Sequence, residues 1–318
     1  MMRIQEDVPL RSKTTMKIGG SARYYAELKT KSDVEEAYKF AKEKNVPLIL
    51  LGAGSNTIFA DGTVEALIAK VAAEAVTIEN TTITVEAGKY LAVLINELAE
   101  KDLDLSPLTG IPGTIGGAIF GNAGQGFGGM WIGSYVESVE VFEIRGKRKE
   151  ERGKWTVYSK KDCEFGYRTS AFKKLSTFHF PLSTPLIWSA TLRIPSRPKE
   201  EIKTEVERLL KKRIETQPHI KTAGSCFLSV SKESPAWKLI DQAGLRGHRI
   251  GDIEVSPKHA NFLINAGSAT YEDAKKLVEY IQSKMTDPLH VEMRFIEENG
   301  RLAYEEEQQS HDTSCTLR

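Results

Sequence analysis

The chain has 318 residues, more than one hydrophobic core usually supports, so we expect two or three domains. Its 44 basic and 43 acidic residues give a net charge of +1, which favours neither nucleic acid nor an anionic membrane as a partner. Three cysteines without metal-ligand spacing predict no metal site and a reducing, cytoplasmic compartment. No apolar run is long enough to span a bilayer, so we expect no membrane insertion.

The first elements alternate between helix and strand. Ser32 followed by Glu35 has the form of a capping box and predicts a helix that ends near Asn45. The apolar run over 46–51 predicts a buried strand. The loop LGAGSN over 51–56 then offers N–H groups to a phosphate, but it lacks the lysine of a P-loop and the third glycine of a dinucleotide fingerprint. Phosphate binding and a simple turn both stay open for this loop.

Two short strands over 77–78 and 82–85 and an amphipathic helix over 90–101 are predicted next. The segment 110–133 follows and contains ten of the 25 glycines. Glycine is entropically costly in an ordered backbone, so such a density needs positive φ angles or a close approach of the backbone to another group. Successive bare N–H groups form an anion-binding concavity, and we interpret the segment as a nest for a diphosphate.

A flexible linker is the alternative for this segment, but linkers of that kind are polar. Here the glycines are interleaved with large apolar side chains, which indicates a buried loop. These side chains are Ile111, Ile115, Ile119, Phe120, Phe127, Met130, Trp131 and Ile132.

The second half of the chain predicts strands over 135–143, 154–158, 185–194 and 289–296. Helices are predicted over 199–213, with Ile202, Val206, Leu209 and Leu210 facing inward, over 236–243, with Ser234 as N-cap, and over 274–285, with a cap at Thr270 and Asp273. Arg168 alone reads as a surface arginine, and Ser225 does not lie in a nucleophile elbow.

Nine short motifs occur in a fixed order, and together they resemble one enzyme family. They are KIGGSA (17–22), LGAGSN (51–56), GIPGTIGGA (110–118), NAG (122–124), FGYRTSAF (165–172), AGS (223–225), LIDQAGLRGHRIG (239–251), KHANFLIN (258–265) and LHVEMRF (289–295). The series resembles the UDP-N-acetylenolpyruvoylglucosamine reductases, the MurB flavoenzymes of bacterial peptidoglycan synthesis. The resemblance covers about residues 5–300.

The resemblance implies an α+β fold: a two-lobed FAD-binding module of the vanillyl-alcohol-oxidase (PCMH) type plus a separate α/β substrate-binding domain. The implied division is 1–70 for lobe 1, 71–200 with the returning strand 288–305 for lobe 2, and 201–287 for the substrate domain. The polar residues 306–318 predict a disordered tail. We expect a monomer.

The resemblance also implies that two loops hold a non-covalent FAD by its diphosphate. The implied cofactor-binding residues are Leu51, Gly52, Ala53, Gly54, Ser55, Asn56, Gly110, Ile111, Pro112, Gly113, Thr114, Gly116, Gly117 and Ala118.

In the implied reaction NADPH reduces FAD, and flavin N5 then passes hydride to the vinyl carbon of the enolpyruvyl ether, which leaves negative charge next to a carboxylate. The implied catalytic residues are Arg168 as the cation that stabilises this charge, Ser225 as the proton donor and Glu292 as its assistant. The alternatives are a structural arginine–glutamate pair and a capping serine.

The implied partners are the UDP-sugar substrate and NADPH. Candidate substrate-binding residues are Tyr167, Arg213, Lys221, Ser229, Lys258, His259 and Asn261. The chain departs from the family pattern at Thr216, where a lysine is usual, and at Ser229, where an asparagine is usual. Two alternatives therefore stay open: an FAD oxidoreductase of the same fold with a different small substrate, and a catalytically silent flavin-binding protein.

Overall fold

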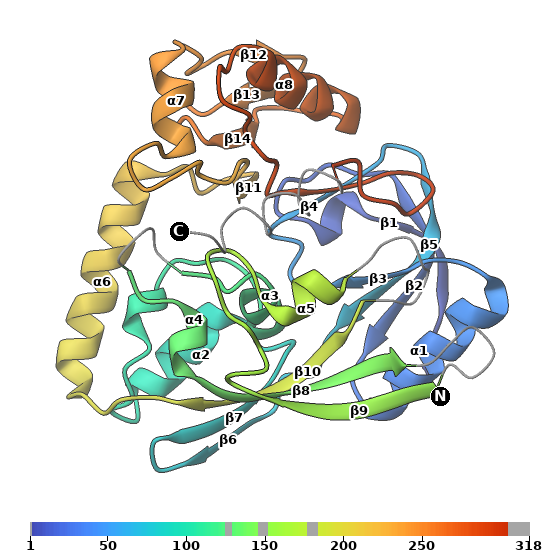
Figure 1. Cartoon of the computed structure of the whole chain (residues 1–318), viewed down its shortest axis with the longest axis vertical. Coiled ribbons are helices and arrows are strands. Elements are labelled where there is room, and N and C mark those ends of the chain that lie inside the picture. Colours follow the sequence, from blue (N-terminus) through green and yellow to red (C-terminus); the bar gives the residue numbers. More distant parts are fainter. Residues whose placement is uncertain (1, 125–128, 146–151, 177–183, 305–318) are drawn as a thin grey trace. The chain divides into compact units, whose positions relative to one another are not determined.

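The computed structural model describes residues 2–124, 129–145, 152–176 and 184–304 (Figure 1). Its contacts divide the chain into two compact units. Unit 1 comprises Met1–Gln5, Tyr25–Ala53 and Leu67–Arg213, and unit 2 comprises Glu6–Tyr24, Gly54–Ala66 and Ile214–Arg318. The domain boundaries expected from the family resemblance stay a prediction, and the predicted tail 306–318 lies outside the described residues.

The N-terminal part of the chain builds a four-stranded sheet in the order β1-β2-β5-β3. Its strands are β1 (Gln5–Pro9), β2 (Ser21–Leu28), β5 (Thr63–Val71) and β3 (Leu48–Leu51), with the 3-10 turn η1 (Arg11–Lys13) after β1. Strands β3 and β5 are parallel, with Leu48 opposite Leu67. The predicted apolar strand is therefore confirmed, and its side chains are largely buried as expected for a strand covered on both faces.

Unit 1 contains a five-stranded antiparallel sheet in the order β6-β7-β10-β8-β9. Its strands are β6 (Val76–Glu79), β7 (Thr82–Glu86), β10 (Leu186–Arg193), β8 (Val136–Arg145) and β9 (Arg152–Ser159). Ile83 and Val85 on β7 and Val139 and Val141 on β8 are buried at alternate positions. The predicted strands are confirmed because period-two apolar patterns fix one face of the sheet toward the core.

The helices of this half of the chain are short, except for the first and the last. They are α1 (Lys31–Lys44), α2 (Leu91–Ala99), α3 (Ile115–Phe120), α4 (Ile132–Tyr135), α5 (Ala171–Leu175) and α6 (Lys199–Thr216), with the 3-10 turn η2 (Ser106–Leu108). The predicted cap of α1 is wrong: Thr30 and Asp33, not Ser32 and Glu35, form the capping box. Asn45 ends α1 in a left-handed conformation, as predicted.

Helix α6 corrects a second prediction. Of the four residues expected to face inward, only Ile202 is buried, and Leu210 is 40% exposed. The helix is a long, largely solvated connector that leads from unit 1 into unit 2 (Figure 1). Its apolar residues follow helical spacing, but only Ile202 reaches a core, so the pattern predicted the helix but not its surroundings.

Unit 2 contains a four-stranded sheet in the order β11-β14-β13-β12 and a parallel pair of strands, β15 and β4. The strands are β11 (Thr222–Ser225), β12 (Arg249–Ile250), β13 (Ile253–Val255), β14 (Phe262–Asn265), β4 (Thr57–Phe59) and β15 (Arg294–Ile296). Helix α8 (Tyr271–Ser283) packs beside β12 and β13 (Figure 1). Its predicted capping box at Thr270 and Asp273 is confirmed.

Two predictions in this unit need correction. Helix α7 (Ala236–Gln242) starts after Pro235, which is its N-cap, so Ser234 is not the cap. The strand predicted over 289–296 is shorter, since regular strand covers only Arg294–Ile296. The preceding residues pair instead through an isolated bridge between Phe227 and Val291. That bridge matters for the placement of Ser225 and Glu292.

Candidate functional site

The glycines of the LGAGSN loop allow two close approaches of backbone to neighbouring groups. A Cβ atom on Gly52 would lie 2.6 Å from Oγ1 of Thr114, so this loop packs directly against the glycine-rich segment in unit 1. Gly54 has a φ of +65°, and its Cβ would lie 2.3 Å from the carbonyl oxygen of Lys13 in unit 2. The two loops expected to hold one diphosphate are thus in contact at Gly52.

The glycine-rich segment is not a continuous loop, because helix α3 begins inside it. Thr114 is the N-cap, and its Oγ1 accepts a hydrogen bond from Gly117 N at 3.5 Å. The N–H groups of Ile115 and Gly116 donate to the carbonyls of Lys89 and Ala87, both at 2.9 Å. Part of the predicted anion nest is therefore used by the protein itself. Residues 125–128 of the segment lie outside the described residues.

The remaining donors of this segment lie at the start of α3. Within the described residues, the N–H groups of Gly113 and Thr114 have no hydrogen-bond acceptor. A Cβ atom on Gly117 would come no closer than 3.8 Å to its nearest neighbour, which is Oγ1 of Thr114. Adjacent free N–H groups beside an uncrowded glycine fit a phosphate group.

A buried asparagine amide holds the segment that carries Arg168. Asn122 Nδ2 donates to Gly166 O at 2.7 Å, and Asn122 Oδ1 accepts from Gly133 N at 3.0 Å. Gly166 and Thr169 form an antiparallel bridge, which places Tyr167 and Arg168 at the tip of a tight turn. The NAG motif therefore works as a scaffold for this turn.

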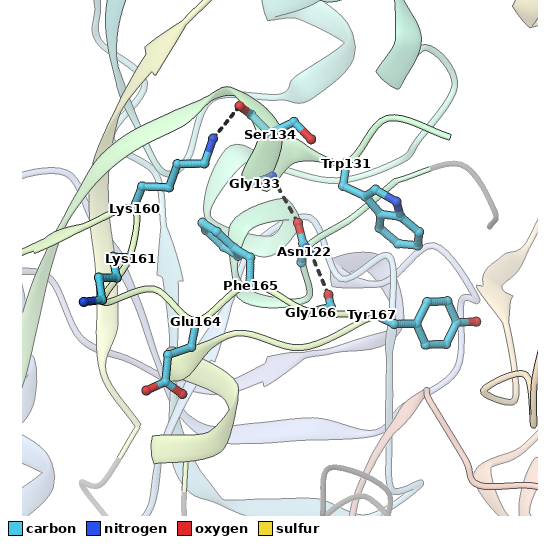
Figure 2. A pocket seen from close by; sticks show the side chains of 10 residues that line it. All are labelled: Asn122, Trp131, Gly133, Ser134, Lys160, Lys161, Glu164, Phe165, Gly166 and Tyr167. Carbon is cyan, nitrogen blue, oxygen red and sulfur yellow. Dashed lines mark hydrogen bonds between the residues drawn. The ribbon is translucent and has the colours of Figure 1, made fainter. Parts of the chain in front are cut away.

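Trp131 and Tyr167 lie beside the Arg168 side chain. The Arg168 guanidinium carbon lies 5.5 Å from the centre of the Trp131 ring, and the Trp131 and Tyr167 rings meet edge to face at 5.7 Å. Both rings line an open cavity of about 760 Å³. Figure 2 shows them on one side of this cavity and Lys160 and Lys161 on the other.

A second arginine lies near Arg168 in unit 1. Arg213 stands near the end of α6, and its Cδ would lie 2.4 Å from a Cβ on Gly110, which has a φ of +78°. Burial and the positive charge of Arg168 lower the pKa of Arg213 to about 10. Within the described residues Arg213 has no carboxylate partner. Arg168 and Arg213 are therefore neighbouring cations, and the desolvated Arg213 has no carboxylate partner within the described residues. Such a pair favours the binding of an anion.

Ser225 and Glu292 lie in unit 2 on two segments that run antiparallel. Glu292 N donates to Cys226 O at 2.8 Å, and Leu228 N donates to His290 O at 2.8 Å. Asn56 Nδ2 donates to Glu292 O at 3.2 Å. This backbone pairing sets Glu292 opposite Cys226, the residue that follows Ser225, and it gives the predicted cofactor residue Asn56 a role in holding Glu292.

Ser225 follows a glycine that lies in open space. Within the described residues its Oγ has no hydrogen-bond partner, and a Cβ on Gly224 would meet no atom within 4 Å. Gly224 has a φ of +81°, which favours glycine before the serine. The neighbouring Cys226 is fully buried, and burial, then the charge of Glu292, raise the pKa of its thiol well above the usual range, so this thiol stays protonated.

The remaining predicted substrate residues make hydrogen bonds within unit 2. Asn261 uses both ends of its amide on Phe227: Oδ1 accepts from N at 3.0 Å and Nδ2 donates to O at 2.8 Å. Lys258 Nζ donates to Ile214 O at 2.7 Å, which neutralises part of the carboxyl end of α6. Their roles toward a substrate stay predictions.

Three further candidate substrate-binding residues also contact other residues of unit 2. Ser229 Oγ accepts from Ala236 N at 3.4 Å at the start of α7. Lys221 Nζ donates to Gly267 O at 3.3 Å. The His259 ring packs edge-on against Phe262 at 4.7 Å.

Comparison with known proteins decides the family. The model described as UDP-N-acetylenolpyruvoylglucosamine reductase, C-terminal domain, matches residues 216–295, and the model described as FAD binding domain matches residues 22–150. The reductase of Chlamydia abortus is 33% identical over 89% of this chain and 90% of its own length. The reductase of Thermotoga petrophila is 34% identical over 88% and 93%. The chain belongs to the UDP-N-acetylenolpyruvoylglucosamine reductase family.

A solved structure of the family supports this assignment. The crystal structure of UDP-N-acetylenolpyruvylglucosamine reductase (MurB) from Thermus caldophilus is similar with a TM-score of 0.75 and 32% identity, over 93% of this chain and 99% of that one. The predicted α+β fold with an FAD-binding module is thereby confirmed, as are the oxidoreductase class and FAD as the cofactor. Within the described residues, no helix is both long and apolar enough to cross a bilayer, and no group of acidic, histidine or cysteine side chains is arranged to hold a metal ion.

Trp131 is the feature that sequence reasoning missed. It was counted among the apolar residues that mark a buried loop, but its ring faces Arg168. A tryptophan among many glycines is a signal for a specific contact, since its large ring needs partners.

Proposed function

We propose that this chain reduces UDP-N-acetylglucosamine enolpyruvate to UDP-N-acetylmuramate, with NADPH as the reductant and with Arg168, Ser225 and Glu292 as the catalytic residues. When bound, FAD carries the hydride from NADPH to the enolpyruvyl group. The free N–H groups of Gly113 and Thr114, the open space over Gly117 and the contact between Gly52 and Thr114 support a diphosphate at this place.

Arg168 is proposed to hold the carboxylate of the enolpyruvyl group. Hydride addition to the vinyl carbon develops negative charge next to this carboxylate, so a fixed cation lowers the energy of the transition state. The placement of Arg213 near Arg168 supports an anionic ligand here, since the desolvated Arg213 gains a partner when an anion binds. Arg213 thereby supplies a cation where the family pattern has a lysine and this chain has Thr216.

Ser225 is proposed to deliver the proton to the carbon that carries the carboxylate. A serine hydroxyl is a weak acid, so its orientation and its neighbours decide its efficiency. The observation that carries this proposal is the antiparallel pairing that sets Glu292 beside Cys226, one residue from Ser225. Glu292 is proposed to assist by sharing a proton with the hydroxyl.

The test is NADPH oxidation by the purified holoprotein. We expect oxidation that depends on the enolpyruvyl UDP-sugar and a product of the mass of UDP-N-acetylmuramate. UDP-N-acetylglucosamine, which lacks the enolpyruvyl group, is the matched control and should not support turnover. A rate of NADPH oxidation that does not depend on the sugar, or that depends on a different small substrate, would overturn the proposal in favour of another oxidoreductase on this fold.

A further inference from the structure

The turn that carries Arg168 fixes its backbone. Arg168 has a φ of +53°, a conformation that non-glycine residues rarely adopt, and Lys173 Nζ donates to its carbonyl at 3.1 Å. Together with the amide of Asn122 on Gly166, these contacts hold the main chain in place. The arginine side chain beyond it still has several rotatable bonds, whose freedom is costly to remove.

The Trp131 ring lies against this side chain. The guanidinium carbon of Arg168 lies 5.5 Å from the ring centre, within the range in which an aromatic face attracts a cation. The ring itself is held on two sides. Tyr167 packs edge-on against it at 5.7 Å, and Gly124 approaches so closely that a Cβ there would lie 2.6 Å from the ring.

The backbone of Trp131 is also fixed. Gly124 and Trp131 form an antiparallel bridge, and Ile132 N donates to Ala123 O at 2.8 Å. The NAG motif over 122–124 thus makes two contacts. Asn122 holds the turn of Arg168, and Gly124 packs against the Trp131 ring. A glycine at 124 is required because the ring occupies the space of a side chain.

We propose that Trp131 is a positioning residue, which holds the guanidinium of Arg168 in the orientation that the substrate carboxylate requires. This inference rests on the function proposed for Arg168. A planar guanidinium binds a carboxylate through two parallel hydrogen bonds, so a rotation of the group weakens both. The alternative is that Trp131 only fills space beside Tyr167.

The test compares the two half-reactions in rapid-mixing experiments on holoprotein that carries Trp131→Leu or Trp131→Phe. Trp155→Leu is the matched control. Its ring is also contacted by a cation, since Lys31 Nζ lies 4.8 Å from the ring centre, and its partners Phe142 and Trp188 belong to the sheet core of unit 1. Each tryptophan change is also made together with Arg168→Lys.

We expect Trp131→Leu to retain FAD and to be reduced by NADPH within about twofold of the normal rate. Reoxidation of the reduced flavin by the enolpyruvyl sugar should slow by about threefold to thirtyfold, the size of a cation–π contact that is partly desolvated. Trp131→Phe, which keeps an aromatic face, should slow it less. In the Arg168→Lys background the effect of Trp131→Leu should shrink to within about twofold, because the group that it orients is gone.

Three results overturn the proposal: an equal loss in both half-reactions, an equal loss for Trp155→Leu, or the same loss with and without Arg168. An Arg168→Lys variant that reoxidises at the normal rate would instead contradict the role proposed for Arg168 itself. If Trp131→Leu does not fold, Trp131→Phe in both backgrounds gives the same comparison with a smaller expected difference.

Discussion

Both units fix a candidate catalytic segment with a buried asparagine, but they do so around different kinds of structure. In unit 1, Asn122 spans Gly166 and Gly133 and holds the turn of Arg168. In unit 2, the Asn261 amide forms hydrogen bonds with both the N–H and the carbonyl of Phe227, two residues after Ser225. Each amide satisfies two backbone groups that burial would otherwise leave unpaired.

The two units differ in how the proposed catalytic side chains are held. Arg168 carries a long side chain on a turn, and its orientation is proposed to depend on side-chain contacts such as that with Trp131. The segments of Ser225 and Glu292 are joined mainly by backbone pairing, with the Asn56 and Asn261 amides as side-chain supports. Unit 1 should therefore be sensitive to changes in neighbouring side chains, whereas unit 2 should be sensitive mainly to changes in its backbone contacts and in the reacting groups themselves.

The largest effect should come from the reacting hydroxyl. Ser225→Ala leaves the backbone pairing intact, so we expect FAD and reduction by NADPH to be retained. Reoxidation by the enolpyruvyl sugar should slow by about 10²–10⁴-fold, the usual contribution of a general acid. Rapid mixing of each half-reaction checks this. Ser225→Cys, which restores a proton donor, should recover part of the rate, and an equal loss in both half-reactions would refute the role.

The next largest effect should come from Gly54, whose backbone lies close to that of Lys13. Gly54→Ala places a Cβ 2.3 Å from the Lys13 carbonyl oxygen at a φ of +65°, so we expect a loss of about 3–5 kcal/mol in the free energy of unfolding. Gly247→Ala is the control, since its φ is +73° but no atom lies within 4 Å of the new methyl. It should cost about 1–2 kcal/mol, the left-handed strain alone. Urea unfolding followed by flavin release measures both, and equal losses would contradict the steric account.

The two asparagines test the comparison directly. Asn122→Ala and Asn261→Ala each leave two buried backbone groups unpaired, so each should destabilise the fold by about 1–3 kcal/mol in urea. Asn122→Ala should in addition raise the substrate KM by loosening the Arg168 turn. Asn261→Ala should raise KM less, because both ends of its amide bond the Phe227 backbone and the pairing of Cys226 with Glu292 remains. The reverse pattern of KM values would show that side-chain networks, not backbone pairing, place the residues of unit 2.

The smallest effect concerns pH. Glu100 after α2 is exposed, and its bonds to Lys199 and then Lys203, both at 2.6 Å, lower its pKa from 4.5 to about 2. A depressed pKa means that the contribution to stability is complete above about pH 4.5 and is lost as the pH falls toward 2. Glu100→Gln should therefore be slightly less stable than the unchanged chain at neutral pH and indistinguishable from it near pH 2. Thermal unfolding across this range checks it, and a difference that grows on acidification would be inconsistent with the assignment.

The sequence predicted most of the strands and helices because each has a strong period or a clear boundary residue. Strand β8 with its alternating valines and helix α8 with its Thr270–Asp273 box are examples. It missed α3, because Gly116 and Gly117 have low helix propensity and the helix is held by bonds to Ala87 and Lys89 that only the fold supplies. The sequence also predicted too wide a buried face for α6, in which only Ile202 is buried.

For the site, the order of the family motifs named Arg168, Ser225 and Glu292, and the structure adds the backbone pairing of Glu292 with Cys226. What no pattern could show is the contact of Trp131 with Arg168 and of Arg213 with Gly110, since these residues are distant in the chain and meet only through tertiary packing. The same holds for Asn56, which lies in a predicted phosphate loop but donates to Glu292 O.

The most direct test of the proposed reaction is a single-turnover experiment on the unchanged holoprotein. Its flavin is reduced with NADPH without oxygen and then mixed with the enolpyruvyl UDP-sugar. We predict reoxidation at a rate no slower than overall turnover, with one equivalent of the saturated lactyl ether formed for each flavin. Reduced flavin that persists in the presence of this sugar, and is reoxidised only when air is admitted, would contradict the proposed function.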